Sequence, residues 1–258
     1  MFVLLKNTES LYSNKYFQKT VKALLLVLTV ISFAFLISYF GKSELSGDDL
    51  AYFQTVNVTW SWIINTRYLA WSSRVFIDVL IPFFVDHSLL LKITCIVFLL
   101  VSPFILLKLL KGNSLIHLLF CFAFISLLPY YEMKTAGFVA TVLNYYFPIV
   151  LALFLCTAIY SNCKLNLLLS FVILITGIFA CNHEQCVVVI FTFSVLALIK
   201  SRPNLNSIAL ETLVISILSL VFILMSPGNS VRMSLEMHNW MPEFAEFSVF
   251  EKMYIGVT

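Results

Sequence analysis

The chain has 258 residues, of which 61% are hydrophobic and 11% charged, and its formal net charge is +3. Soluble domains contain about 25% charged residues, so lipid is expected to be the solvent for most of this protein. The small positive charge comes without a basic stripe interleaved with aromatic residues, which excludes a nucleic-acid partner. We therefore expect one integral membrane domain over residues 1–258, in contact with membrane lipid.

Apolar runs along the chain predict an all-α, polytopic bundle of transmembrane helices, because a helix needs about 20 residues to cross a bilayer. About seven spans are expected, with interfacial helices in the first outer loop. Five spans cover approximately residues 22–40, 88–110, 114–130, 142–161 and 207–225, and two form a hairpin between Lys164 and Lys200. The 35 residues of that hairpin extend only about 53 Å as helix. Its tip at 181–185 is therefore expected near the edge of the hydrocarbon.

The loops between these runs differ in charge, which predicts the orientation of the chain. Cationic residues precede the first span, end the second, and separate the fourth from the fifth and the sixth from the seventh: Lys6, Lys15, Lys19, Lys22, Lys108, Lys111, Lys164, Lys200 and Arg202. Such loops stay in the cytoplasm, so we expect a cytoplasmic N-terminus (1–21) and a multi-pass protein of the inner (plasma) membrane. Residues 41–87 and 226–258 are then outer segments. Within the first, 41–73 is expected to lie along the membrane surface and 75–85 to form an interfacial or half-buried helix.

An acidic pair, Asp48 and Asp49, follows the first span. Either carboxylate is suited to act as a general base on an acceptor hydroxyl, and the pair also offers oxygen ligands to a divalent cation. The alternative is a solvated acidic loop, or the negatively charged first turn of a following helix.

An arginine, Arg74, opens the short apolar helix 75–85, just after Tyr68 and Trp71. A guanidinium at the membrane edge matches the oxygens of a phosphate group. It is also placed to pair with Asp78, four residues later on the same helix face. Both interpretations stay open at this stage.

Two further polar groups interrupt apolar sequence. At the hairpin tip, His183 and Glu184 are ionisable groups at membrane depth, which by default indicate function such as a proton shuttle; the alternative is a polar turn that caps two helices. The nearby cysteines fit no structural zinc spacing, so no metal site is predicted there. After the last span, Asn229 and Arg232 form either an anion cradle or part of a plain helix terminator.

Taken together, four polar clusters from separate outer loops converge on one face of the membrane. Arginines and carboxylates at that boundary suit an amphipathic substrate with a lipid tail and an anionic head, such as a polyprenyl-phosphate-linked sugar. Arg74 and Arg232 would hold the phosphate and stabilise it as a leaving group. Asp48 or Asp49 would take the proton from the attacking hydroxyl. No cofactor is required for this chemistry, although a divalent cation stays open.

Five short motifs occur in a fixed order: Gly47-Asp48-Asp49, Trp71-Ser72-Ser73-Arg74, Asn144-Tyr145-Tyr146-Phe147-Pro148, His183-Glu184 and Pro227-Gly228-Asn229-Ser230-Val231-Arg232. With them, residues 20–235 resemble a family of bacterial multi-spanning proteins that is thought to act in surface-polysaccharide glycosylation, within the GT-C class of membrane glycosyltransferases. The resemblance implies a GT-C-like fold, a polyprenyl-phosphate sugar donor and a cell-surface glycan acceptor. It implies Asp48 or Asp49 in the catalytic position and substrate binding by the other polar and aromatic residues: Tyr68, Trp71, Arg74, Asn144, Tyr145, His183, Glu184, Asn229 and Arg232.

Members of that family are usually much longer, so we expect this chain to be a truncated or split product. Two other hypotheses stay open. A transporter, flippase or polymerase of lipid-linked saccharides would use similar arginines without a catalytic base. A non-catalytic membrane subunit would use neither.

Overall fold

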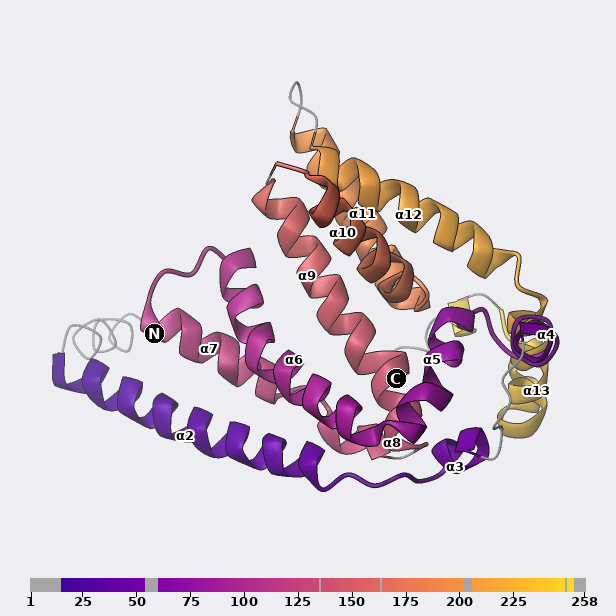
Figure 1. Cartoon of the computed structure of the whole chain (residues 1–258), viewed down its shortest axis with the longest axis horizontal. Helices are drawn as coiled ribbons and strands as arrows, with labels where there is room; N and C mark the ends of the chain where they lie inside the picture. Colours follow the sequence, from indigo (N-terminus) through magenta and orange to yellow (C-terminus); the bar gives the residue numbers. More distant parts are fainter. Residues whose placement is uncertain are drawn as a thin grey trace.

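The computed structural model describes residues 15–53, 60–134, 136–162, 164–201, 206–248 and 250–252, and every regular element among them is helical (Figure 1). The long α-helices are α2 (Lys15–Gly41), α5 (Val75–Asp86), α6 (Ser88–Leu109), α7 (Leu115–Ser126), α9 (Phe147–Ser161), α10 (Leu167–Ala180), α11 (Glu184–Lys200), α12 (Ser207–Leu224) and α13 (Pro227–Trp240). The short elements are α3 (Asp48–Phe53), α4 (Trp60–Trp62), α8 (Phe138–Thr141), the π-helices η1 (Ile63–Tyr68) and η3 (Val142–Tyr146), and the 3-10 helices η2 (Tyr130–Lys134) and η4 (Pro242–Ala245).

Several helices begin at a polar residue in a loop that the sequence predicts to be cytoplasmic. The side-chain oxygen of Ser114 accepts from the backbone N–H of the third residue of α7, and those of Asn166 and Asn206 do the same for α10 and α12. Such N-caps satisfy backbone donors that a helix leaves unpaired in its first turn. They explain why these helices start where the apolar runs start.

Four helices of the described chain are long and apolar enough to cross a membrane: Lys19–Gly41, Ser88–Leu109, Phe138–Ser161 and Ser207–Leu224. They correspond to the first, second, fourth and seventh predicted spans, and several helices of this kind indicate a membrane protein. The fourth begins at residue 138 rather than 142, because α8 and η3 run directly into α9.

The predicted count of about seven spans is not confirmed. The helices at the third, fifth and sixth predicted positions have 12, 14 and 17 residues, or about 18, 21 and 26 Å of helix, against a hydrocarbon core of about 30 Å. The third was predicted to reach residue 130, but α7 ends at Ser126. Pro129 cannot continue a helix and disfavours helical geometry in the residue before it.

The described residues of the predicted first outer segment, 41–87, are mostly helical. They include α3, the continuous pair α4 and η1, and then α5. The predicted interfacial or half-buried helix 75–85 is α5, whose Ile77, Ile81 and Val85 are buried in the protein. Residues 1–14, 54–59 and 253–258 of the predicted outer and cytoplasmic segments lie outside the described residues, as do Cys163 and Arg202.

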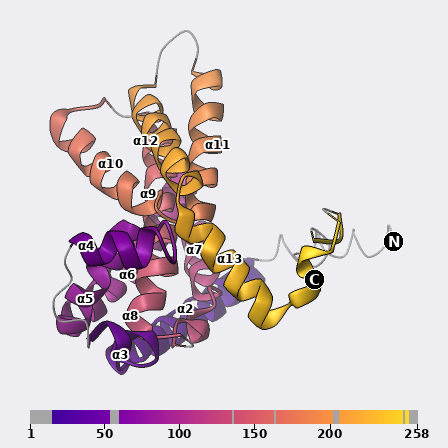
Figure 2. The same cartoon turned by 90° about the vertical axis from the view of Figure 1, so that its right-hand side faces the viewer.

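Helix α9 organises the molecule. Along most of its length it packs against α10, α11 and α12, and this group has one apolar core centred on residues such as Leu155, Ile173 and Ile190. A second core joins the other end of α9 to α5, α6, α8 and the end of α2. Both views place α3, α5 and α8 around that second end (Figure 1, Figure 2). The candidate site lies there.

Candidate functional site

A polar cavity of about 160 Å³ lies at this end of α9. Five separate segments line it, from α3, η1 with the loop after it, α5, the α8–η3 region and α13: Asp48, Tyr52, Arg67, Trp71, Ser72, Arg74, Asp78, Ala136, Ala140, Thr141, Asn144, Tyr145 and Arg232. Of the predicted site residues, Asp48, Trp71, Arg74, Asn144, Tyr145 and Arg232 therefore share one cavity. The other five, Tyr68, Asp49, His183, Glu184 and Asn229, surround it without lining it.

The two adjacent aspartates have different environments. Asp49 is fully buried, and its carboxylate accepts hydrogen bonds from the backbone N–H groups of Val139 (3.1 Å), Ala140 (2.9 Å) and Ser46 (3.3 Å). It thus caps α8 from a distant part of the chain. Asp48 is exposed, lines the cavity, and its carboxylate accepts no hydrogen bond from any described residue. Of these two aspartates, only Asp48 has a carboxylate without a hydrogen bond from the described residues.

A glycine turn holds Asp48 in place. Gly47 has a φ of +51°, a conformation that residues with a Cβ rarely adopt, and a Cβ there would lie 2.4 Å from the carbonyl oxygen of Ala136. The backbone N–H of Asp48 donates to that same carbonyl at 2.7 Å. The acidic pair is therefore tied by its backbone to the start of the α8–α9 helix.

Arg74 pairs with the hairpin tip rather than with Asp78. Its Nη2 lies 2.7 Å and its Nε 3.0 Å from Oε2 of Glu184. Its Nη1 donates to the side-chain oxygen of Asn144 at 3.3 Å, and its guanidinium lies 5.4 Å from the centre of the Tyr145 ring. Residues from three sequence motifs thus meet at one side chain. The charge of Arg74 is already compensated by a carboxylate.

Asp78 instead pairs with Arg67, a combination that the sequence analysis missed. Nε of Arg67 donates to Oδ2 of Asp78 at 2.8 Å, and the Tyr52 hydroxyl, which accepts from Arg67, donates to Oδ1 at 3.1 Å. Burial and then the Asp78 charge raise the pKa of Tyr52, so the hydroxyl stays protonated. A carboxylate within the apolar run 75–85 was the available signal, but nothing in the sequence identifies Arg67 as its partner.

The hairpin tip caps α5. The side-chain oxygen of Asn182 accepts from the backbone N–H of Phe76 at 3.1 Å, and its amide nitrogen donates to the carbonyl of Ser73 at 2.9 Å. Arg74, the residue at the N-cap position itself, contributes no side-chain cap. The tip therefore caps a helix of another segment. The predicted alternative was a turn that caps the two helices of the hairpin itself, but His183, at the N-cap position of α11, makes no side-chain cap.

The Ser226–Asn229 turn also packs on the loop that carries Arg74. Ser226 donates to the carbonyl of Tyr68 at 3.0 Å, and Asn229 accepts from the backbone N–H of Ser73 at 3.1 Å while donating to the carbonyl of Ile223 at 3.0 Å. Pro227 begins α13 at its first turn rather than only ending α12. The Asn229 amide is therefore engaged within the protein and holds the turn against the loop.

Arg232 is the arginine of the cavity whose charge is compensated least. Its guanidinium lies over Trp71, 5.3 Å from the ring centre, and its contact with Glu236, one turn later on α13, is long at 3.9 Å. Its side chain is 36% exposed. Tyr68, by contrast, packs its ring on Phe222 and directs its hydroxyl to the carbonyl of that residue, away from the cavity.

His183 is buried beside the cavity, with its ring 5.5 Å from that of Tyr145. Neither ring nitrogen has a hydrogen-bond partner among the described residues. Burial, and then the positive charge of Arg74, lower the pKa of His183. Glu184, the predicted partner of His183, instead forms an ion pair with Arg74. Within the described chain no three His, Cys, Asp or Glu side chains gather in a way that would hold a metal ion, and Cys181 and Cys186 are free thiols.

The fold and the cavity together define a helical membrane protein with a charged pocket where several helices end. Comparison with family models, with curated proteins and with solved structures finds no match for this chain.

Proposed function

We propose that this protein transfers a sugar from a polyprenyl-phosphate donor to a cell-surface glycan, at the outer face of the plasma membrane and with its N-terminus in the cytoplasm. The observation that carries the proposal is that one cavity is lined both by the Asp48 carboxylate, which has no hydrogen bond from the described residues, and by the weakly compensated Arg232 guanidinium. A base and an anion-binding group that share a cavity are the two parts that this displacement requires.

Asp48 takes the proton from an acceptor hydroxyl, whose oxygen attacks the anomeric carbon of the donor sugar. The bond between that carbon and the phosphate oxygen breaks, and the polyprenyl phosphate leaves with the electron pair. Arg232 stabilises the charge that develops on the phosphate. Arg74 is already neutralised by Glu184, so it contributes less charge and instead orients Asn144 and the Tyr145 ring along the cavity wall. A single displacement of this kind inverts the sugar carbon.

The size and position of the cavity support a lipid-linked substrate. Its volume of about 160 Å³ is below the roughly 300–1,000 Å³ of pockets that enclose a whole small ligand. It is suited to a head group whose tail stays in the bilayer. Transporters place their sites near the middle of the membrane, whereas this cavity is lined by α3, α5, α13 and the α8–η3 region that leads into the start of α9. That placement favours surface chemistry over transport.

The test compares Asp48→Asn with Asp86→Asn in the full chain reconstituted in lipid nanodiscs. Asp86 is an exposed aspartate at the end of α5 that does not line the cavity, so its substitution is a matched loss of charge. With a panel of polyprenyl-phosphate hexoses, we expect wild type and Asp86→Asn to release polyprenyl phosphate at equal rates. Asp48→Asn is expected to lose about 10²–10⁴-fold in rate while retaining donor binding, followed by the fluorescence of Trp71 and its neighbours.

The competing hypotheses give different results in the same preparations. A flippase would move a labelled donor between the leaflets of a vesicle, and Asp48→Asn would leave that flux unchanged. A non-catalytic subunit would bind the donor without releasing polyprenyl phosphate in any variant.

A further inference from the structure

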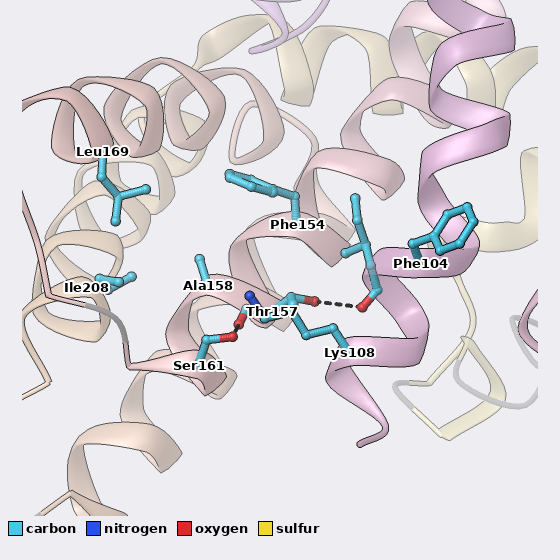
Figure 3. A pocket seen from close by; sticks show the side chains of 9 residues that line it. Phe104, Lys108, Phe154, Thr157, Ala158, Ser161, Leu169 and Ile208 are labelled. Atoms are coloured by element: carbon cyan, nitrogen blue, oxygen red, sulfur yellow. Dashed lines mark hydrogen bonds between the residues drawn. The ribbon is translucent and has the colours of Figure 1, made fainter. Parts of the chain in front are cut away.

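A second cavity lies at the opposite end of α9, near the lysine-rich loops (Figure 3). Its volume is about 350 Å³, within the range of small-molecule sites. Helix α6 forms one wall, α9 the floor, and α10 with α12 the other wall. The side chains that line it are Phe104, Ile105, Lys108, Phe154, Thr157, Ala158, Ser161, Leu169 and Ile208.

The interior of this crevice offers almost no free polar group to a ligand, although two hydroxyl groups line it. Both hydroxyl groups are engaged by backbone carbonyls. That of Thr157 donates to the carbonyl of Leu153 at 2.8 Å and lies 3.4 Å from that of Ile105 on α6. That of Ser161 donates to the carbonyl of Thr157 at 2.8 Å. From Phe154 to Ser161 the crevice follows two turns of α9, which is about 10 Å. Its walls therefore suit a segment of hydrocarbon chain.

Lys108 supplies the charge that this apolar crevice otherwise lacks. It is exposed, it lies one residue before the end of α6, and it has no ion-pair partner among the described residues. Further lysines occur at helix ends in the predicted cytoplasmic loops: Lys111 and Lys164 follow the ends of α6 and α9, and Lys200 is the last residue of α11. The neighbouring stretches 104–117, 154–170 and 195–212 hold one carboxylate, Glu211. That carboxylate accepts from the hydroxyl of Ser170 at 2.8 Å and makes no described ion pair with a lysine.

We propose that this crevice binds an anionic phospholipid, with part of one acyl chain between α6 and the α10–α12 pair and the phosphate on Lys108. Basic pockets between transmembrane helices hold anionic head groups in this way. Charge complementarity distinguishes the occupant from bulk lipid, because a zwitterionic head group would leave the excess of lysines uncompensated. The site is separate from the polar cavity and does not depend on the sugar-transfer proposal.

The test measures which lipids the purified full chain retains, by native mass spectrometry after extraction from nanodiscs of phosphatidylglycerol and phosphatidylcholine in equal amounts. Wild type is expected to retain phosphatidylglycerol preferentially. A lysine that only attracts anionic lipid to its leaflet contributes about 1 kcal/mol, so its loss would lower the retention of phosphatidylglycerol about fivefold. Lys108→Gln should lower the retention of phosphatidylglycerol about tenfold more than Lys200→Gln does. Lys200 lies on the same side of the molecule but does not line the crevice.

A second variant, Ala158→Phe, fills the crevice without changing charge, and circular dichroism checks that its helices are intact. It should lose the retained phosphatidylglycerol although all lysines are present. Equal effects of Lys108→Gln and Lys200→Gln would overturn the proposal in favour of general leaflet attraction. Equal retention of both lipids by the wild type would overturn it in favour of nonspecific filling by lipid tails.

Discussion

At the scale of single residues, two neighbouring carboxylates have acquired different roles through their surroundings. Asp49 is buried under three backbone N–H groups, and Asp48 faces the cavity with no hydrogen bond from the described chain. The sequence predicts that one of them matters chemically, because both follow the first span. It cannot separate them, since the separation arises from residues 139 and 140, about ninety positions later.

Substitution of Asp49 is expected to destabilise the fold. Asp49→Asn replaces one acceptor oxygen by an NH₂ group, which then faces backbone donors. Hydrogen bonds to a charged group contribute about 1.5–3 kcal/mol and a buried unsatisfied donor costs about 1–3 kcal/mol, so we expect a loss of about 2–3 kcal/mol. Unfolding of the purified protein in mixed detergent micelles measures this change.

Asp48→Asn is the matched control in the same measurement. Because Asp48 is exposed, its free energy of unfolding should change by no more than about 0.5 kcal/mol. Equal losses in the two variants would contradict the division of roles between them.

The partner of Arg74 is a second residue-scale result. Sequence spacing placed Asp78 on the same helix face, four residues away. In the structure Arg74 lies at the N-cap position of α5 with φ −78° and ψ 40°, outside the helix. Its side chain is therefore free to reach Glu184, and Asp78 is left for Arg67. A helical spacing rule does not apply to a residue that is not helical.

At the scale of elements, the loop between η1 and α5 is held by two distant asparagines. Asn182 from the α10–α11 tip and Asn229 from α13 both bind the backbone of Ser73. Gly228, beside Asn229, approaches the backbone of the same loop. These contacts fix the position of Trp71 and Arg74 along the cavity wall. The motifs that the sequence presents in order are, in space, parts of one packed junction.

Gly228→Ala tests this junction. A Cβ at residue 228 would lie 2.7 Å from the backbone nitrogen of Trp71 and from the carbonyl oxygen of Tyr68. Overpacking of this kind costs about 1–3 kcal/mol, whereas helix propensity alone predicts a gain for alanine within α13. We expect a net loss in the free energy of unfolding, with a weakened response of Trp71 fluorescence to polyprenyl phosphate.

Gly41→Ala serves as the control, because a Cβ at the end of α2 meets nothing within 4 Å. It should be neutral or stabilising by up to about 1 kcal/mol. A gain of stability in Gly228→Ala would show that the turn does not pack as closely as described.

At the scale of the whole molecule, polar chemistry and lysine-rich loops lie at opposite ends of the helices. Glu184 begins α11 beside Arg74, and Lys200 ends the same helix about 25 Å away. The polar cavity and the proposed lipid crevice therefore lie at different ends of α9.

Single cysteines at residues 44 and 200 should react from opposite sides of the membrane. In a variant with the six native cysteines replaced by alanine, Glu44→Cys is expected to react with an impermeant maleimide in intact cells. Lys200→Cys should react only after permeabilisation, because cationic loops stay in the cytoplasm. Both positions are exposed, so access is limited by the membrane rather than by burial. Labelling of both from one side would contradict the orientation.

The sequence by itself determined the helical class, the apolar character and the start of several helices. These properties depend on local composition and on capping residues, which act over a few positions. The sequence also identified most of the candidate residues, because charged groups are costly in an apolar chain and therefore indicate function. Its count of about seven spans is not confirmed, since the composition of an apolar run does not determine how many of its residues are helical.

The tertiary structure alone decided which of these residues meet. The start of α8 binds the Asp49 carboxylate and not that of Asp48, Arg74 pairs with Glu184, and Asn229 binds the backbone of Ser73. Each of these outcomes rests on contacts between segments tens of residues apart or more. Electrostatic and hydrogen-bonding partners are chosen by distance in space, and that distance is set only when the helices pack.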